Sequence, residues 1–233
     1  MHLKRHLASY FLLSALIALL ANSSSRAQPV AEAPPSSAQP AKDSRLMKLV
    51  AEGKLTSQIL YPMRKGSNWT YDMDVQGKTL EMKCRIASKE KINDQELYKL
   101  EAAFNGQVSA TEHMSNNKRG LARHRNNGIE LTPALQLLRN PVKPGDRWQQ
   151  EVEHGGTKLK TTCKTSAEVI TTPLGKFDVI RVTLNTAVEG INIDADYWFA
   201  ADVGCVRQVL NLGQTKANVV LRKYELAKEE KPE

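Results

Sequence analysis

Residues 62–69 read PMRKGSNW, and residues 141–148 read PVKPGDRW, so one proline–glycine–tryptophan motif occurs twice, 79 positions apart. Beyond the motif, the same offset aligns Cys84 with Cys163. A proline fixes the chain as it enters a turn, a glycine permits the reversal, and a tryptophan begins the next strand as a large core anchor. Matches at one constant offset indicate an internal repeat of a turn followed by a strand.

Polarity alternates with a period of two along several segments of the chain. Leu80, Met82 and Cys84 alternate with polar or charged neighbours, and residues 159–165 and 191–199 follow the same rule. This pattern is typical of antiparallel strands with one wet face. Turn dipeptides such as Asn-Gly and Gly-Gly separate the segments, which favours a series of hairpins.

The alternation and the repeat together predict an all-β fold with a minor helical part. We expect two repeated antiparallel β-meanders, at about residues 55–139 and 140–226, that form a curved sheet or half-open barrel. Asp43 or Ser44 is placed to cap one short helix. The run PALQLL, at residues 133–138, predicts a second short helix.

The first 27 residues have the three-part order of a secretory signal. Lys4 and Arg5 precede an apolar run over residues 7–21, and small residues lead to a cleavage site at Ala27. An uncleaved membrane anchor is the alternative. Because no Cys follows the apolar run, we expect no lipoprotein attachment, and a periplasmic or secreted protein. The expected organisation is a signal peptide at 1–27, a disordered Pro/Ala/Ser linker at 28–44, a β domain at 45–227 and a charged tail at 228–233.

Removal of the leader leaves 30 Lys and Arg against 25 Asp and Glu, a net charge of about +5. So mild an excess favours anionic surfaces but is too diffuse to indicate nucleic acid. An exported protein also rarely meets nucleic acid. The expected partner class is therefore a lipid or another component of the cell envelope.

Two further motifs follow the repeated turn. A Gly-x-Phe-x-x-x-Arg-Val segment begins at Gly175, and a Tyr-Trp-Phe-Ala-x-x-Val-Gly-x-Val segment begins at Tyr197. With the turn, they resemble uncharacterised secreted and lipoprotein domains of environmental bacteria, over roughly residues 55–226. The resemblance implies a scaffold and no catalytic residues. A weaker resemblance, to the half-open barrels of the LolA/LolB lipoprotein carriers, implies an apolar concavity that holds acyl chains.

The candidate ligand site follows from a half-open barrel. Its concave face is expected to carry the apolar residues Leu80, Met82, Leu159, Ile193 and Tyr197. Residues of this kind, left unfilled on a concave sheet, hold an apolar or amphipathic guest.

A basic stretch forms a second candidate site. Lys118, Arg119, Arg123 and Arg125 lie close together in the sequence, and they predict a small patch that binds anionic groups. The alternative is a solvated hairpin whose charges guard a sheet edge.

Three cysteines lie in the mature region. Cys84 and Cys163 occupy equal places in the two repeats, so we expect them to form a disulfide in an oxidising compartment. Cys205 is then the odd thiol.

The sequence contains few residues or motifs that are typical of catalytic sites. Only His113, His124 and His154 remain after the leader, without metal-ligand spacing, a nucleophile elbow or a phosphate loop. No catalytic residue, metal or cofactor is therefore expected. A non-catalytic binding domain is the favoured function, a structural or interaction module that docks on another envelope protein is the alternative, and an enzyme of unknown class is third.

Overall fold

The computed structural model describes residues 39–42, 44–188, 190–213 and 215–228. The predicted signal peptide, most of the predicted linker and most of the charged tail fall outside these residues. The elements are α2 (Arg45–Ala51), α3 (Ser57–Leu60), β1 (Asn68–Val75), β2 (Lys78–Ile92), β3 (Gln95–Phe104), β4 (Gln107–Asn117), β5 (Gly120–Asn126), β6 (Ile129–Arg139), β7 (Arg147–His154), β8 (Thr157–Thr172), β9 (Gly175–Val188), β10 (Ile191–Ala200), β11 (Gly204–Leu212) and β12 (Thr215–Glu225).

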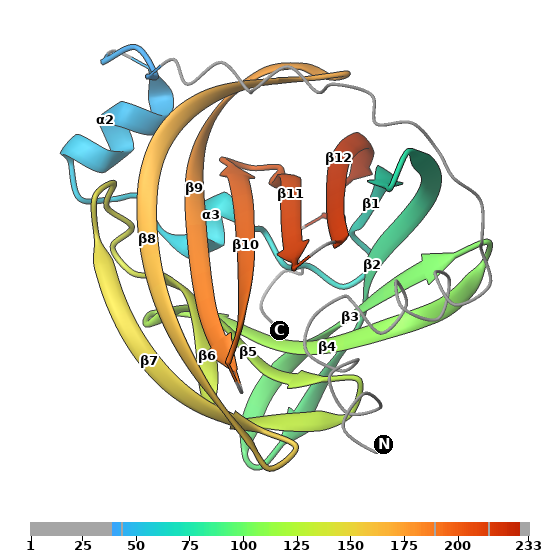
Figure 1. The fold of residues 1–233 in the computed structure, drawn as a ribbon. Coiled ribbons are helices and arrows are strands. Elements are labelled where there is room, and N and C mark those ends of the chain that lie inside the picture. Colours follow the sequence, from blue (N-terminus) through green and yellow to red (C-terminus); the bar gives the residue numbers. More distant parts are fainter. Residues whose placement is uncertain (1–38, 43, 189, 214, 229–233) are drawn as a thin grey trace.

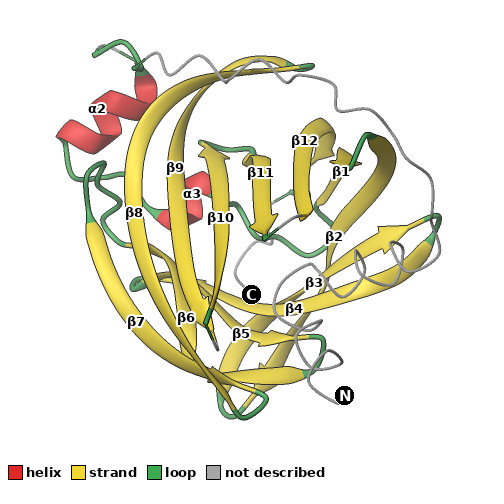
Figure 2. Ribbon diagram, in the orientation of Figure 1, coloured by secondary structure: helices red, strands yellow, loops and turns green. Residues whose placement is uncertain are grey.

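The twelve strands form one closed antiparallel barrel (Figure 1). Each strand pairs with its neighbours in the sequence, and β12 pairs with β1 to close the ring. The all-β class agrees with the sequence prediction, and strands dominate the fold (Figure 2). The prediction of a curved sheet or half-open barrel is wrong, because the last strand returns to the first and leaves no free edge between them.

Alternating burial sorts the side chains between the lumen and the solvent. Along β1, every second residue from Trp69 to Val75 is buried, and the residues between them are partly exposed. On β8 the same rule buries Leu159, Thr161 and Cys163. Hairpin connections join consecutive strands, so the wet and dry faces stay in register around the ring.

The two copies of the tryptophan motif occupy corresponding positions. Trp69 lies opposite Cys84 in the β1–β2 pair, and Trp148 lies opposite Cys163 in the β7–β8 pair. β1 and β7 are six places apart in the ring of twelve strands. The two motifs therefore begin the first and second groups of six strands.

The segment before β1, residues 44–63, lies across one end of the barrel, and we call it the plug segment. The carbonyl of Leu55 accepts a hydrogen bond from the N–H of Val142, in the β6–β7 loop, at 2.8 Å. The carbonyl of Ile59 accepts one from the N–H of Asp202, in the β10–β11 turn, also at 2.8 Å. Both connections belong to the same end of the barrel, so the plug segment covers that end.

The helix predictions have different outcomes. Ser44 caps α2, as expected, because its hydroxyl accepts a hydrogen bond from the N–H of Met47. The predicted helix at residues 133–138 is wrong, because this run belongs to β6. A short apolar run does not distinguish a buried strand from a helix. Neither described helix is long and apolar enough to cross a membrane.

Aromatic rings join the plug segment to the barrel core. The ring of Tyr61 lies edge-on to Trp69, with centroids 5.3 Å apart, and 5.8 Å from the ring of Phe199. Gly204 adopts a φ of +108° beside them. A Cβ atom on Gly204 would lie 2.8 Å from a ring carbon of Tyr61, so only glycine fits here.

We predict that Gly204→Ala destabilises the fold more than Gly175→Ala does. Gly175 has a similar φ of +113°, but a Cβ there would meet nothing within 4 Å. The two variants therefore share the backbone strain, and only Gly204→Ala adds overpacking, expected at about 1–3 kcal/mol. Urea unfolding of both variants measures the difference, and equal free energies of unfolding would contradict it.

Candidate functional site

A buried ion pair lies inside the barrel. Glu112 on β4 and Arg123 on β5 approach within 2.9 Å, and their side chains are 5% and 3% exposed. Tyr197 on β10 lines the same small cavity as this pair. Burial alone would lower the pKa of Arg123, but the negative charge of Glu112 outweighs burial and raises the pKa above its ordinary value. The guanidinium of Arg123 therefore stays protonated and remains paired with Glu112.

This ion pair borders a small cavity that also touches part of the predicted concave face. Met82 and Tyr197 line the cavity, whose volume is about 40 Å³. That volume holds one or two water molecules. Leu159 and Ile193 are buried in the core, and Leu80 packs against it. An acyl chain does not fit in the space that Met82 and Tyr197 border.

The three cysteines are unbridged thiols. All three are buried. The predicted disulfide between Cys84 and Cys163 is wrong, because β2 and β8 lie on opposite sides of the ring and the filled lumen separates them. Burial raises the pKa of Cys163 and of Cys205 to about 12, and it raises that of Cys84 as well.

The basic stretch is divided between the two faces of the barrel. A bulge interrupts the β5–β6 pairing between Arg123 and Arg125. Arg123 points into the lumen toward Glu112, whereas Arg119 and Arg125 line a groove on the outer face. Lys118 is exposed in the β4–β5 turn. Arg123 therefore does not belong to the predicted anionic patch, whereas Arg119 and Arg125 line the same groove from opposite ends of β5.

The outer groove has a volume of about 780 Å³. It extends from the β2–β3 hairpin, at residues 92–98, across β4 and β5 to residues 130–136 of β6. Lys89 and Glu96 in its wall form an ion pair of 2.7 Å. Arg119 and Arg125 form no ion pair with a described residue. With Lys89 they give the groove three positive charges against two negative ones, from Glu96 and Glu130, so its net charge is +1.

His124 contributes little charge to the outer groove at neutral pH. Its Nε2 atom lies 2.9 Å from the Ser115 hydroxyl. Burial and, after it, the nearby Arg119 cation lower the pKa of His124, whereas Glu130 opposes this shift. Below that lowered pKa the imidazole is protonated and adds positive charge, so the groove attracts anions more strongly in acid.

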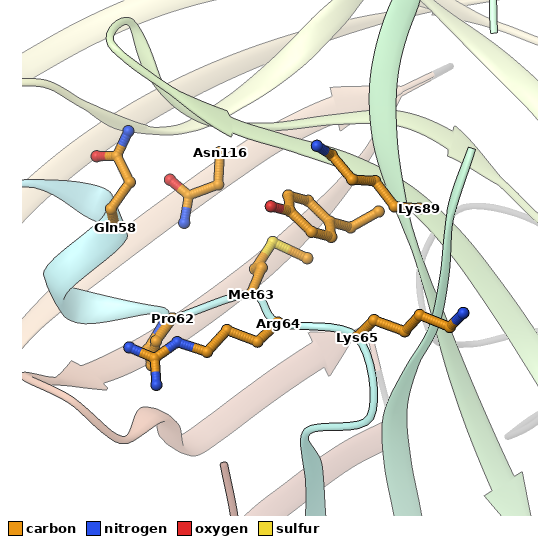
Figure 3. A pocket seen from close by; sticks show the side chains of 8 residues that line it. Gln58, Pro62, Met63, Arg64, Lys65, Lys89 and Asn116 are labelled. Atoms are coloured by element: carbon orange, nitrogen blue, oxygen red, sulfur yellow. The ribbon is translucent and has the colours of Figure 1, made fainter. Parts of the chain in front are cut away.

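A second pocket lies at the covered end of the barrel, between the plug segment and the β2–β3 hairpin (Figure 3). We call it the mouth pocket, and its volume is about 330 Å³. Met63 and Lys89 line it (Figure 3), and the Lys89 ammonium lies 5.9 Å from the ring centre of Tyr98. Lys89, Tyr98 and Asn116 line both the mouth pocket and the outer groove, so the two hollows adjoin.

Sequence reasoning missed most of the groove. The polar residues of the β2–β3 hairpin and of residues 130–136 lie far apart in the chain, and only the bend of the outer sheet brings them together. The basic stretch was the one signal in the sequence. Among the described residues, no group of three or more His, Cys, Asp or Glu side chains could hold a metal ion.

No protein-family model matches the chain, and no curated protein matches it significantly. Three crystal structures are similar in fold. A candidate lipoprotein from Parabacteroides distasonis has 14% identity and a TM-score of 0.43, over 73% of this chain and 99% of its own. A candidate exported protein with a YmcC-like fold from Bacteroides fragilis has 15% identity and a TM-score of 0.42, over 72% and 99%. The hypothetical lipoprotein YmcC from Escherichia coli has 14% identity and a TM-score of 0.39, over 78% and 98%.

We predict that Arg123→Met destabilises the protein by about 3–5 kcal/mol, because it leaves Glu112 buried without its cation. The double variant Glu112→Gln, Arg123→Met should lose less than the sum of the two single variants. Urea unfolding of the four proteins measures this coupling. Additive losses would show that the pair does not interact.

We also predict that the folded protein resists thiol alkylation. At pH 8 the buried thiols stay protonated and covered, so iodoacetamide should modify all three cysteines only in concentrated urea. Mass spectrometry counts the modified groups. Rapid labelling of the folded protein, or a mass two hydrogens short of the reduced chain, would contradict this prediction.

Proposed function

We propose that this protein is an exported, non-catalytic docking module that binds an acidic segment of another envelope protein in its outer groove. The observation that carries the proposal is the pairing of a large polar groove with two arginines, Arg119 and Arg125, that form no ion pair with a described residue. The export part rests on the leader at residues 1–27.

The lining of the outer groove favours a polypeptide as the partner. Amide side chains such as Asn93, Asn117 and Gln136 stand among small apolar residues such as Ala122. Amides both donate and accept hydrogen bonds, as a peptide backbone requires. Among the described residues, Tyr98 and the His124 imidazole are the two aromatic side chains in this lining, so it offers little of the stacking surface that sugar rings use.

The charge of the groove favours an acidic partner. A carboxylate that reaches Arg119 or Arg125 gains a charge-assisted hydrogen bond, often through both nitrogens of the guanidinium. Glu130 lies in the same groove and repels an acidic side chain placed beside it. The acidic side chains of the partner must therefore lie away from Glu130.

An apolar carrier, the function favoured by the sequence, has less support. It requires an open concave face, whereas the sheet is closed and Met82 and Tyr197 border a cavity of about 40 Å³. A filled lumen suits a module that works by surface contact.

We also propose that the two groups of six strands are the two repeats, at about residues 55–139 and 140–226. The equal pairing of Trp69 with Cys84 and of Trp148 with Cys163 supports this division. The basic stretch has no counterpart at the 79-residue offset, where residues 197–204 read YWFAADVG. The groove is therefore a property of the first repeat.

We predict that the double variant Arg119→Glu, Arg125→Glu weakens binding of an acidic peptide by at least about tenfold, because two attractions become repulsions. The probe is a fluorescent twelve-residue peptide of alternating Glu and Thr, and anisotropy at low salt measures its Kd. Lys176→Glu, an exposed change at the start of β9, is the control and should bind as the parent does.

The same titration also gives results that would contradict the docking function. Binding should weaken as salt rises, because screening reduces attraction between exposed charges. If the parent does not bind the peptide, or if Lys176→Glu weakens binding as much as the groove variant does, the docking function is wrong. Turnover of a substrate by the purified protein would contradict the proposal that it is non-catalytic.

A further inference from the structure

The barrel has a weak seam between β6 and β7. Among the described residues, these strands pair at two positions only, Leu131 with His154 and Thr132 with Glu153. Every other pair of neighbouring strands is joined over six or more residue positions. Figure 1 shows β6 and β7 diverging toward the end that the plug segment covers.

A side chain takes the place of the missing strand ladder at this seam. The amide oxygen of Gln150, on β7, accepts a hydrogen bond from the backbone N–H of Gln136, on β6, at 2.9 Å. The amide nitrogen of Gln150 donates to the backbone carbonyl of the same residue, also at 2.9 Å. A peptide group of a neighbouring strand makes this same pair of hydrogen bonds.

The side-chain hydrogen bonds imply that the backbones of β6 and β7 lie further apart here than those of directly paired strands. Paired strands lie about 4.8 Å apart when their backbones bond directly. At Gln136 a side-chain amide stands where the next backbone belongs, so the backbone of β7 lies a side-chain length further away. The Gln136 peptide group therefore has no backbone partner on β7, and it becomes available to an extended peptide once the Gln150 side chain swings out.

Charges and an unsatisfied donor lie around the seam. Arg139, Lys143 and Arg147 are exposed around it. The guanidinium of Arg139 lies 5.0 Å from the ring centre of Trp148. The indole N–H of Trp148 is buried and has no hydrogen-bond partner among the described residues, which is costly to maintain unless a partner arrives.

We propose that the β6–β7 seam binds an extended acidic peptide by strand addition, with the peptide backbone replacing the Gln150 amide on Gln136. This inference rests on the proposed docking function and specifies how the partner binds. Backbone pairing supplies affinity in such complexes, and alternate side chains supply selectivity. The Gln136 backbone already binds an amide, so a peptide unit matches the chemistry in place.

Two observations single out an acidic peptide of another protein as the occupant. The outer groove includes Thr132, Pro133 and Gln136, so a peptide bound there already lies beside β6. The cations Arg139, Lys143 and Arg147 continue the positive charge of the groove to the start of β7. A second copy of this chain is the other possible occupant, and it would reveal itself as a concentration-dependent dimer.

The experiment follows the Gln136 amide proton by hydrogen exchange in ¹⁵N-labelled protein, with and without the alternating Glu/Thr peptide. A saturating peptide should slow this exchange by at least about tenfold, because a backbone partner holds more firmly than a mobile side chain. A second peptide carries the same side chains but an N-methyl group on every backbone amide, so neither edge of the extended peptide keeps an N–H donor. It keeps the charge, cannot form the ladder, and should leave the Gln136 exchange unchanged.

A variant pair tests the role of Gln150 directly. Gln150→Ala removes the competitor for Gln136, so the unmodified peptide should bind about tenfold more tightly. Gln149→Ala changes the exposed neighbour on β7 and should bind as the parent does. The hydrogen exchange of the parent keeps the test valid if Gln150→Ala does not fold.

The outcomes separate this inference from the docking function. If the peptide binds and depends on Arg119 and Arg125, but Gln136 exchange does not change or the N-methylated peptide binds equally, strand addition is wrong and groove docking stands. If neither peptide binds, both proposals fail. Protection of Gln136 that rises with protein concentration, without peptide, would replace the partner by a second copy of the chain.

Discussion

β12 pairs with β1 over eight residue positions, from Asn68 opposite Glu225 to Val75 opposite Ala217, and this pairing closes the sheet. A ring of about eight strands encloses a space that its own side chains fill, and a wider ring leaves more room. Twelve strands therefore require extra filling. Large rings such as Trp69, and Tyr61 from the plug segment, provide it, so closure and the covered end depend on each other.

The same constraint explains the charges in the lumen. Glu112 and Arg123 lie on neighbouring strands and neutralise each other away from bulk solvent. A buried pair of this kind adds little net stability over an apolar pair, but either residue alone is costly. The pair therefore favours the one register of β4 and β5 that brings the two side chains together, and it removes Arg123 from the outer face.

Much of the fold could be predicted from sequence, and the failures have physical causes. Period-two alternation identified the strands, and the helix cap at Ser44 was correct. Closure could not be predicted, because alternation gives the wet and dry faces and not the curvature of the sheet. The disulfide failed because Cys84 and Cys163 face the same lumen from opposite walls. Arg123 was misplaced because a bulge in the β5–β6 pairing, which no residue pattern marks, separates it from Arg125.

A closed sheet also constrains how such a protein can bind another. Closure hides the backbone donors and acceptors that an open sheet offers at its edges, which prevents uncontrolled strand pairing. Recognition then relies on outward side chains or on a place where the ladder is interrupted. Arg119 and Arg125 are the outward side chains. The interrupted ladder lies between β6 and β7, where the Gln150 side chain replaces a strand. Both features border β6, so charge attraction can bring an acidic segment to the groove before any backbone hydrogen bond is exchanged. The segment would then lie beside the β6–β7 pairing, which is the shortest strand pairing among the described residues of the barrel.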